Sequence, residues 1–434
     1  MGTEIHIASL VSFGLLFLFM ASGIWVFAAL GLAGIVTSSL LLHSLAMIPF
    51  IPFSSTNSWT LTALPFFVFT GEIFLFSGIM EGVYATTETL FRRLPGTLLH
   101  TNIVACSMFG TLTGSAAATA ATIGTVALPQ LEKRGYDMRV ATASVASGGI
   151  LGGLIPPSTV FIIYGSMTGV SVGQLFFAGI IPGIILTLIF MGIIIAWTLK
   201  NPAIVPHGKD TKAVSIKSFT TYIPLAIISV VILGGIYLGM YTVSEAGAIA
   251  CSCSVLIVAI YRRLSWDVLN KAVRATIEIT CMFMIIIMGS SIFSNALAGL
   301  LLPHKVAKLV SEIYVNPYVV LLAITVLYVF LGCFIEAIAI MLMTLAVVFP
   351  VVTKLGFDPL WFGVVMYVYC GIGCITPPLG TNLYVVMGLR GGKGSMSEVV
   401  AGITPFLFGL LLLLIILVLF PSLATWLPSK MFVG

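Results

Sequence analysis

This sequence contains very few charged residues. Only 8% of its 434 residues are charged, 59% are hydrophobic and the mean hydropathy is +1.18. Soluble domains carry about 25% charged residues, so an ordinary soluble fold is excluded. Apolar segments of about 20 residues, the length that crosses roughly 30 Å of hydrocarbon, recur from Ile7 to Leu427. We therefore predict an all-α polytopic protein embedded in the lipid bilayer, with no soluble domain left over and no nucleic-acid partner.

Histidine and cysteine are too few and too scattered for two kinds of site. An intramembrane serine protease with Ser115 as nucleophile would need a base within hydrogen-bond reach, but the histidines map near membrane edges or loops: 6, 43, 100, 207 and 304. We therefore do not expect an enzyme. The cysteines lack metal-ligand spacing and partnering histidines, which indicates small buried hydrophobic residues; they are 106, 251, 253, 281, 333, 370 and 374.

The few basic residues cluster in short loops, which mark the cytoplasmic side of a membrane protein. Fifteen of the 19 fall in the loops at 92–93, 133–139, 200–217, 262–274 and 390–393. Helices near 5–20 and 23–46 and a third from Thr60 towards Arg92 fit this pattern, with both termini outside the cytoplasm. No basic region precedes the first apolar run, which favours a first helix over a cleaved signal.

Two apolar runs contain a glycine-rich stretch followed by two prolines, at 152–157 and 373–378. Two successive prolines remove backbone donors and collide with the preceding turn, so both helices should break. A break at membrane depth is tolerated only where protein or a water-filled cavity receives the freed backbone groups. A single break could be a simple kink, but two breaks in register within a repeat favour a binding site.

A repeat relates the two halves of the chain. A shift of 221 residues superposes Pro129 on Pro350, Gly135 on Gly356, Asp137 on Asp358 and the two Pro-Pro pairs, and two further residues align Gly179 with Gly402 and Pro182 with Pro405. The charge map places the loop at Lys133 inside and its counterpart at Lys354 outside. Inverted repeats with paired broken helices are typical of secondary transporters with a binding site near the midplane.

Each break is preceded by a second irregular stretch, at 110–115 and 331–336. The flanking arms of the first are about 22 Å long at 1.5 Å per residue, so we predict a re-entrant helical hairpin in each repeat, followed by a broken crossing helix. Full helices are expected at 172–199, 219–239, 242–261 and 276–302, with an amphipathic interfacial stretch at 265–274. The predicted domains are scaffold helices 1–96, transport core 97–170, scaffold 171–302 with a cytoplasmic loop at 200–218, transport core 303–390, and a last scaffold helix with the C-terminus at 391–434.

The ends of half-helices at membrane depth favour the binding of ions. Last carbonyls can replace the hydration shell of a small cation, and first amides suit an anion. The candidate sodium ligands are Gly110, Thr113, Gly114, Gly152, Ile155 and Pro156 in the first copy and Gly332, Glu336, Gly373, Thr376 and Pro377 in the second. The candidate ligands of an anionic substrate are Ser115, Ser158, Thr159, Thr381 and Asn382. Neither break carries a lysine or arginine, so an anion would depend on amide dipoles and on bound cations, with sodium ions as the expected co-transported species.

Plainer interpretations remain open for some of these residues. The small-residue run 115–120 is also typical of a close helix-packing face. A glutamate at membrane depth is costly unless it is functional or paired, and for Glu336 this favours a function. Glu72 and Glu278 fit a structural pair or a scaffold role equally well, and Glu245 fits a helix cap.

The motifs along the whole chain resemble those of the large membrane subunit of tripartite ATP-independent periplasmic (TRAP) transporters. The matching segments are 64–71, 77–79, 114–115, 135–137, 155–158 and 163–165 in the first half and 245–246, 356–358, 361–363 and 375–380 in the second. The chain departs from the family at Glu336, where an aspartate is usual, and at Ala116, where a second serine is usual.

The resemblance implies an elevator mechanism, in which hairpins and broken helices move as one body against a scaffold. It also implies sodium-coupled import of a carboxylate or sulfonate across a bacterial inner membrane, with two or more sodium ions. The partners implied are a small four-helix membrane subunit, expected as a separate chain, and a periplasmic substrate-binding protein that delivers the organic anion. A stand-alone sodium/anion symporter of similar inverted-repeat architecture is the alternative.

Overall fold

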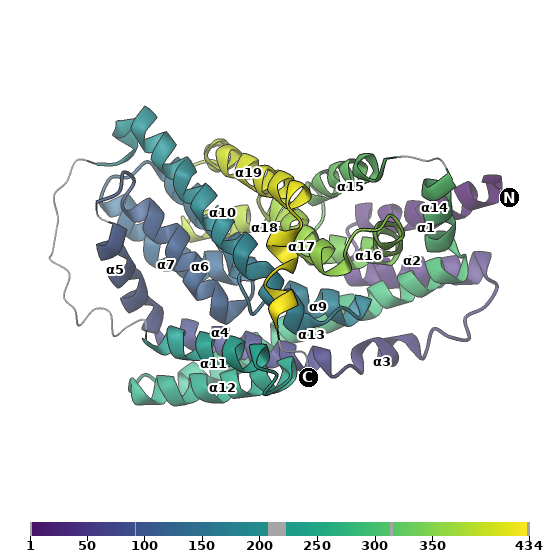
Figure 1. The fold of residues 1–434 in the computed structure, drawn as a ribbon, viewed down its shortest axis with the longest axis horizontal. Helices are drawn as coiled ribbons and strands as arrows, with labels where there is room; N and C mark the ends of the chain where they lie inside the picture. The colour runs from purple at the N-terminus through teal and green to yellow at the C-terminus, as the bar shows by residue number, and fades with distance from the viewer. Residues whose placement is uncertain (1, 92, 207–222, 313–315, 432–434) are drawn as a thin grey trace.

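The computed structural model describes residues 2–91, 93–206, 223–312 and 316–431, and these contain helices and no strand. Within these described ranges, six helices are long and apolar enough to cross a membrane, or seven if a bent pair counts as one span. The prediction of an all-α polytopic membrane protein is confirmed. Figure 1 shows an elongated arrangement with α6 and α7 towards one end, α15 and α16 towards the other, and α9, α17 and α18 between them.

The first helices differ in part from those predicted. Helix α1 spans Gly2–Ala21, α2 is shorter than predicted at Val26–Leu41, and a short α3 spans Ile51–Thr56. The single helix predicted from Thr60 towards Arg92 is wrong, because the chain forms a 3₁₀ turn, η1 (Thr60–Thr62), then α4 (Ala63–Ser77) and α5 (Ile79–Phe91). The reason is Gly78, whose φ of +70° is left-handed and ends α4, a common helix ending at glycine.

The first predicted hairpin and broken helix are present. Helices α6 (Leu98–Thr113) and α7 (Ala116–Lys133) are joined only by Gly114 and Ser115. The prediction that 110–115 is irregular was too wide, since α6 continues through Thr113 before Gly114 turns left-handed at φ +59°. Helices α8 (Met138–Leu154) and α9 (Thr159–Thr168) are separated by the Pro-Pro break and bent by 43°.

The middle of the chain consists of long helices. Helix α10 spans Val172–Lys200, followed by a 3₁₀ turn, η2 (Pro202–Ile204), then α11 (Ile223–Tyr237) and α12 (Val243–Ile260). From residue 207 onward the predicted cytoplasmic loop lies outside the described residues, as does the predicted start of α11 at 219. Helix α13 is one continuous helix of 34 residues, Trp266–Gly299. The interfacial stretch at 265–274 is therefore not a separate element, because Ser265 caps the same helix.

The second copy repeats the order of elements. An unpredicted short helix, α14 (Leu302–Glu312), precedes the hairpin α15 (Pro317–Gly332) and α16 (Ala337–Lys354), the broken pair α17 (Pro359–Ile375) and α18 (Thr381–Leu389), and the long α19 (Met396–Leu419). Short α20 (Ser422–Thr425) and the 3₁₀ turn η4 (Pro428–Lys430) follow. Helices α7 and α16 begin 221 residues apart, as do α8 and α17. The inverted orientation of the copies and the domain boundaries stay predictions.

Close glycine contacts hold the long helices together. A Cβ at Gly34 of α2 would lie 2.7 Å from the backbone nitrogen of Phe293, and one at Gly289 of α13 would clash with the carbonyl oxygen of Phe27. Helix α13 also packs against α4 and α16. It therefore connects the first helices of the chain with the second hairpin.

Candidate functional site

The tip of the first hairpin is bonded to the break in the first broken helix. The carbonyl oxygen of Gly114 accepts hydrogen bonds from the backbone nitrogen of Thr159 at 3.1 Å and from its hydroxyl at 2.9 Å. Behind the tip the two helices touch through glycines, since a Cβ at Gly110 would overlap the Cα of Gly152. The contact leaves no space for a side chain and fixes the tip against the break.

The second copy makes the same pair of contacts with different residues. The carbonyl oxygen of Cys333 accepts from the backbone nitrogen of Leu379 at 3.3 Å. A Cβ at Gly332 would lie 2.7 Å from the Cα of Gly373. Each hairpin tip is therefore held at the break that its own repeat supplies.

Glu336 is the N-cap of α16. Its carboxylate accepts from the backbone nitrogens of Ile338 at 3.0 Å and Ala339 at 3.1 Å. A carboxylate at a helix N-terminus is stabilised by the helix dipole, which gives this half-buried acid a partner within its own helix. In the first copy Ser115 caps α7 at the equivalent position, where its hydroxyl accepts from Ala118.

A cavity of about 390 Å³ lies where the starts of four helices meet. Its wall includes the first residues or caps of α7, α9, α16 and α18, together with parts of α4, α13 and α17. Five of the predicted site residues line it: Gly114, Ser115, Thr159, Glu336 and Thr381. No lysine, arginine or histidine is among the described residues that line it. Helix starts present amides and partial positive charge, so these four starts favour an anion within a wall that is otherwise mostly apolar.

The structure places other predicted substrate ligands behind the cavity wall. Ser158 is fully buried and its hydroxyl accepts from the backbone nitrogen of Phe161 as the cap of α9. Asn382 is also fully buried, and its amide donates to the carbonyl oxygen of Ala146 at 2.8 Å. This second contact joins α18 to α8. A role of either residue in substrate binding stays a prediction.

The predicted sodium ligands are divided between helix interiors and true breaks. The carbonyl oxygen of Gly110 already accepts from Gly114 at 3.0 Å, and the hydroxyl of Thr113 shares a hydrogen bond with that of Thr119 at 2.8 Å. Gly152, Gly332 and Gly373 lie in the glycine contacts. The residues at or beside the actual breaks are Ile155, Pro156, Thr376 and Pro377. Among the described residues no three acidic, histidine or cysteine side chains form a metal cluster, so a cation here would depend on carbonyl and hydroxyl oxygens.

Sequence reasoning missed one residue that joins the two broken helices. The Tyr367 hydroxyl donates to the carbonyl oxygen of Ile150 at 2.6 Å, and the tyrosine occupies the space that a Cβ at Gly153 would need. A tyrosine in an apolar run carries no signal of its partner. Only the adjacent glycines at 152 and 153 hint that another group approaches α8 closely.

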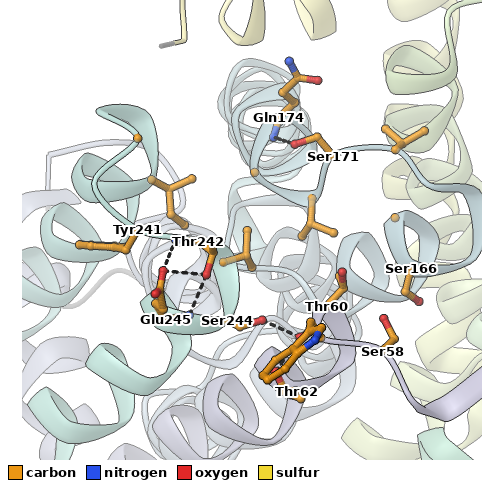
Figure 2. A pocket seen from close by; sticks show the side chains of 18 of the residues that line it. Ser58, Thr60, Thr62, Ser166, Ser171, Gln174, Tyr241, Thr242, Ser244 and Glu245 are labelled. Atoms are coloured by element: carbon orange, nitrogen blue, oxygen red, sulfur yellow. Dashed lines mark hydrogen bonds between the residues drawn. The ribbon is translucent and has the colours of Figure 1, made fainter. Parts of the chain in front are cut away.

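A larger hollow of about 1,090 Å³ lies elsewhere, over η1 and the starts of α10 and α12. Figure 2 shows its hydroxyl-rich wall, with the caps Ser171 and Thr242 and the bond from Ser244 to the carbonyl oxygen of Trp59, 2.6 Å long. Glu245 completes a capping box with Thr242, as its position near a helix start predicted. None of the predicted sodium or substrate ligands lines this hollow, so it is distinct from the cavity at the helix starts.

Two hairpin tips held against two broken helices, around a cavity lined by helix starts, define a membrane transport protein. Comparison with known proteins agrees. Residues 13–423 match the family described as the tripartite ATP-independent periplasmic transporter, DctM component. The chain belongs to this family and is its large membrane subunit, which confirms the resemblance found in the sequence.

Relatives cover nearly the whole chain. It is 32% identical over 409 residues to the C4-dicarboxylate TRAP transporter large permease protein of Pseudomonas aeruginosa, covering 92% of this chain and 94% of that protein. It is 31% identical over 413 residues to the isethionate TRAP transporter permease protein of Oleidesulfovibrio alaskensis, covering 93% of this chain and 64% of that longer protein. In fold it is similar to the Alcanivorax borkumensis YdaH transporter, with a TM-score of 0.69, 16% identity and coverage of 95% and 98%.

Proposed function

We propose that this chain is the membrane subunit of a sodium-coupled importer of an organic anion, which works by an elevator mechanism. The observation that supports this most is the cavity walled by the starts of α7, α9, α16 and α18. Each helix start carries about half a positive charge, so four starts suit a carboxylate or sulfonate without any basic side chain.

The charges at the same place support sodium coupling. Two glutamates, Glu72 and Glu336, lie in the cavity wall, and no basic residue is among the described residues there. An anion that binds beside two carboxylates needs compensating cations. Carbonyls released at the breaks after α8 and α17 are suited to hold them, and the hairpin contacts at Gly114 and Cys333 tie those breaks to the substrate cavity.

The family supports a substrate-binding protein as the donor and a small membrane subunit as the partner. The names of the relatives indicate C4-dicarboxylates and isethionate as model substrates. The hollow in Figure 2 lies among segments that the charge map assigns to the outer side. With the inner membrane of a bacterium as the location, this face would receive the periplasmic binding protein.

The elevator movement is supported by the position of the cavity. Its wall combines the hairpin and broken-helix starts with Leu75 of α4 and Ile279 and Phe283 of α13. The first group belongs to the predicted transport core and the second to the predicted scaffold. A substrate at this seam would change its exposure if the core slid along the scaffold.

Reconstitution tests the proposal. The chain, co-expressed with its small subunit, is placed in liposomes, and uptake of radiolabelled succinate and isethionate is measured with the cognate binding protein outside. We expect uptake of one of these anions under an inward sodium gradient and none under a potassium gradient. Uptake that does not depend on sodium would contradict sodium coupling. Sodium-driven uptake of free substrate by the chain without a binding protein would favour the stand-alone symporter.

A further inference from the structure

The proposed mechanism uses Glu72 only as a negative charge in the cavity wall and assigns it no bound ion. It is the acidic residue of the apolar helix α4 and only 6% exposed. It makes no ion pair or hydrogen bond with any residue in the part of the chain that the structure describes. A buried carboxylate without a partner is unfavourable unless a cation or a proton neutralises it. The structural-pair interpretation of Glu72 therefore fails within the described residues.

A small void separates Glu72 from the tip of the first hairpin. Its volume is about 20 Å³, and oxygen-bearing side chains from both sides line it: Glu72, Thr113, Ser115 and Thr159. Val68, Ile279 and Phe283 close it with apolar surface. A void of this size holds one water molecule and hence one desolvated monovalent ion of similar size.

The hydroxyls around the void have lone pairs to offer. The Thr159 hydroxyl donates to the carbonyl oxygen of Gly114 at 2.9 Å, so the lone pairs of the Thr159 hydroxyl oxygen are free to bind a cation. The Ser115 hydroxyl accepts a long bond of 3.4 Å from Ala118 and retains a second lone pair. A carboxylate with several neutral oxygens is the ligand set of a hard cation. A proton would need only the carboxylate.

We propose that Glu72, Ser115 and Thr159 bind one sodium ion between α4 and the first hairpin. This site is separate from the carbonyl sites inside the predicted core. It rests on the proposed function and deepens it by making one ion bridge scaffold and core. It also removes the repulsion between Glu72 and an anion in the adjoining cavity, which shares Glu72, Ser115 and Thr159 with the void.

The close packing beside Glu72 makes the site specific to this conformation. A Cβ at the neighbouring Gly71 would lie 2.8 Å from the Cα of Thr113. The carboxylate and the hairpin hydroxyls are brought together by that contact. If the core moves along α4, the ligands separate and the ion is released.

The test is equilibrium binding of ²²Na⁺ to the purified complex in nanodiscs, without substrate. We expect Glu72→Gln to lower the number of sodium ions bound per chain by one, or to weaken one site about tenfold or more, because a charged ligand is lost. Glu72→Asp should give a smaller loss. The matched control is Glu278→Gln, which changes an exposed glutamate of α13 outside the void.

The outcomes separate this inference from the proposed function. If the wild-type complex binds no sodium, both fail. If it binds sodium and Glu72→Gln binds the same number with the same affinity, only the site at Glu72 is overturned. If Glu72→Gln keeps sodium binding but changes the pH dependence of uptake, Glu72 binds a proton, and the sodium site is also overturned. Should Glu72→Gln not assemble, Thr159→Val provides the same comparison.

Discussion

Ser115 and Glu336 occupy equivalent positions, 221 residues apart, and each caps the second helix of a hairpin. The first copy uses a neutral hydroxyl and the second a full negative charge. The two tips are therefore alike in backbone and different in electrostatics. A cation near the second tip would lie close to the charged side chain of Glu336. A cation near the first tip would instead depend on the charge of Glu72 on α4.

Replacing Glu336 with glutamine removes the charge and keeps an oxygen that can accept from Ile338 and Ala339. We expect the complex to assemble and the sodium concentration for half-maximal uptake to rise about tenfold, which corresponds to roughly 1.4 kcal/mol. A sodium titration of uptake measures this, with Glu81→Gln on the exposed face of α5 as the control. Unchanged sodium activation would count against Glu336 as a ligand.

Glu336→Asp tests the departure of this chain from its family at the same tip. Aspartate is a stronger N-cap than most residues and keeps the charge closer to the backbone. We expect sodium dependence to be retained and thermal stability to stay within about 1 kcal/mol of the natural chain. A loss as large as that of the glutamine variant would show that the longer side chain is required.

At the scale of elements, the structure depends on glycine contacts between hairpin and broken helix. The pairs Gly110 with Gly152 and Gly332 with Gly373 let two backbones touch in each repeat. Small residues at such crossings are what helix packing in membranes uses in place of a hydrophobic driving force. The contact also explains why both copies keep glycine in the helix interior, where it weakens the helix itself.

Gly110→Ala should separate the first hairpin from α8. The added methyl group would overlap the Cα of Gly152, and overpacking of this kind costs about 1–3 kcal/mol of unfolding free energy. Thermal unfolding of the purified complex measures the loss. Gly192→Ala is the matched control, because it lies in α10 with nothing within 4 Å of its Cβ and should be neutral or stabilising by up to about 1 kcal/mol. Equal stabilities of the two variants would contradict the contact.

The elements that were predicted best from the sequence are those whose backbone conformation is set by covalent structure, such as the proline ring. The Pro-Pro pairs break their helices where expected, and both hairpins follow from the repeat. The end of α4 at Gly78 was missed because an isolated glycine in an apolar run is equally compatible with a continuous helix. The carbonyl of Gly110 was predicted to be free, but helix α6 continues past it and uses it. Which hydroxyls face the cavity depends on packing between distant elements, and no local pattern encodes that.

For the whole molecule, specific side-chain bonds cross the boundary between the predicted transport core and the predicted scaffold, called the seam below. The hydroxyls of Thr111 in α6 and Ser229 in α11 lie 3.1 Å apart. The Ser290 hydroxyl of α13 donates to the carbonyl oxygen of Leu342 in α16 at 2.6 Å. In an elevator these bonds must break in each cycle, whereas bonds within the core persist.

A disulfide across the seam should therefore stop transport. In a background whose seven cysteines are replaced, Thr111→Cys with Ser229→Cys places two sulfurs near bonding distance. We expect uptake to be lost on oxidation and recovered with dithiothreitol, and each single variant to be insensitive to oxidation. Full uptake by the oxidised, cross-linked protein would contradict movement at this seam.

The length of helix α13 affects how the whole molecule fits the membrane. Its 34 residues extend about 51 Å at 1.5 Å per residue, well beyond the roughly 30 Å of a hydrocarbon layer, so it must tilt or project from the membrane. Because its side chains Ile279 and Phe283 form part of the cavity wall, its inclination sets the shape of that wall. Acyl-chain length should thus act as a mechanical control on uptake, which a series of liposomes with short and long lipids can measure.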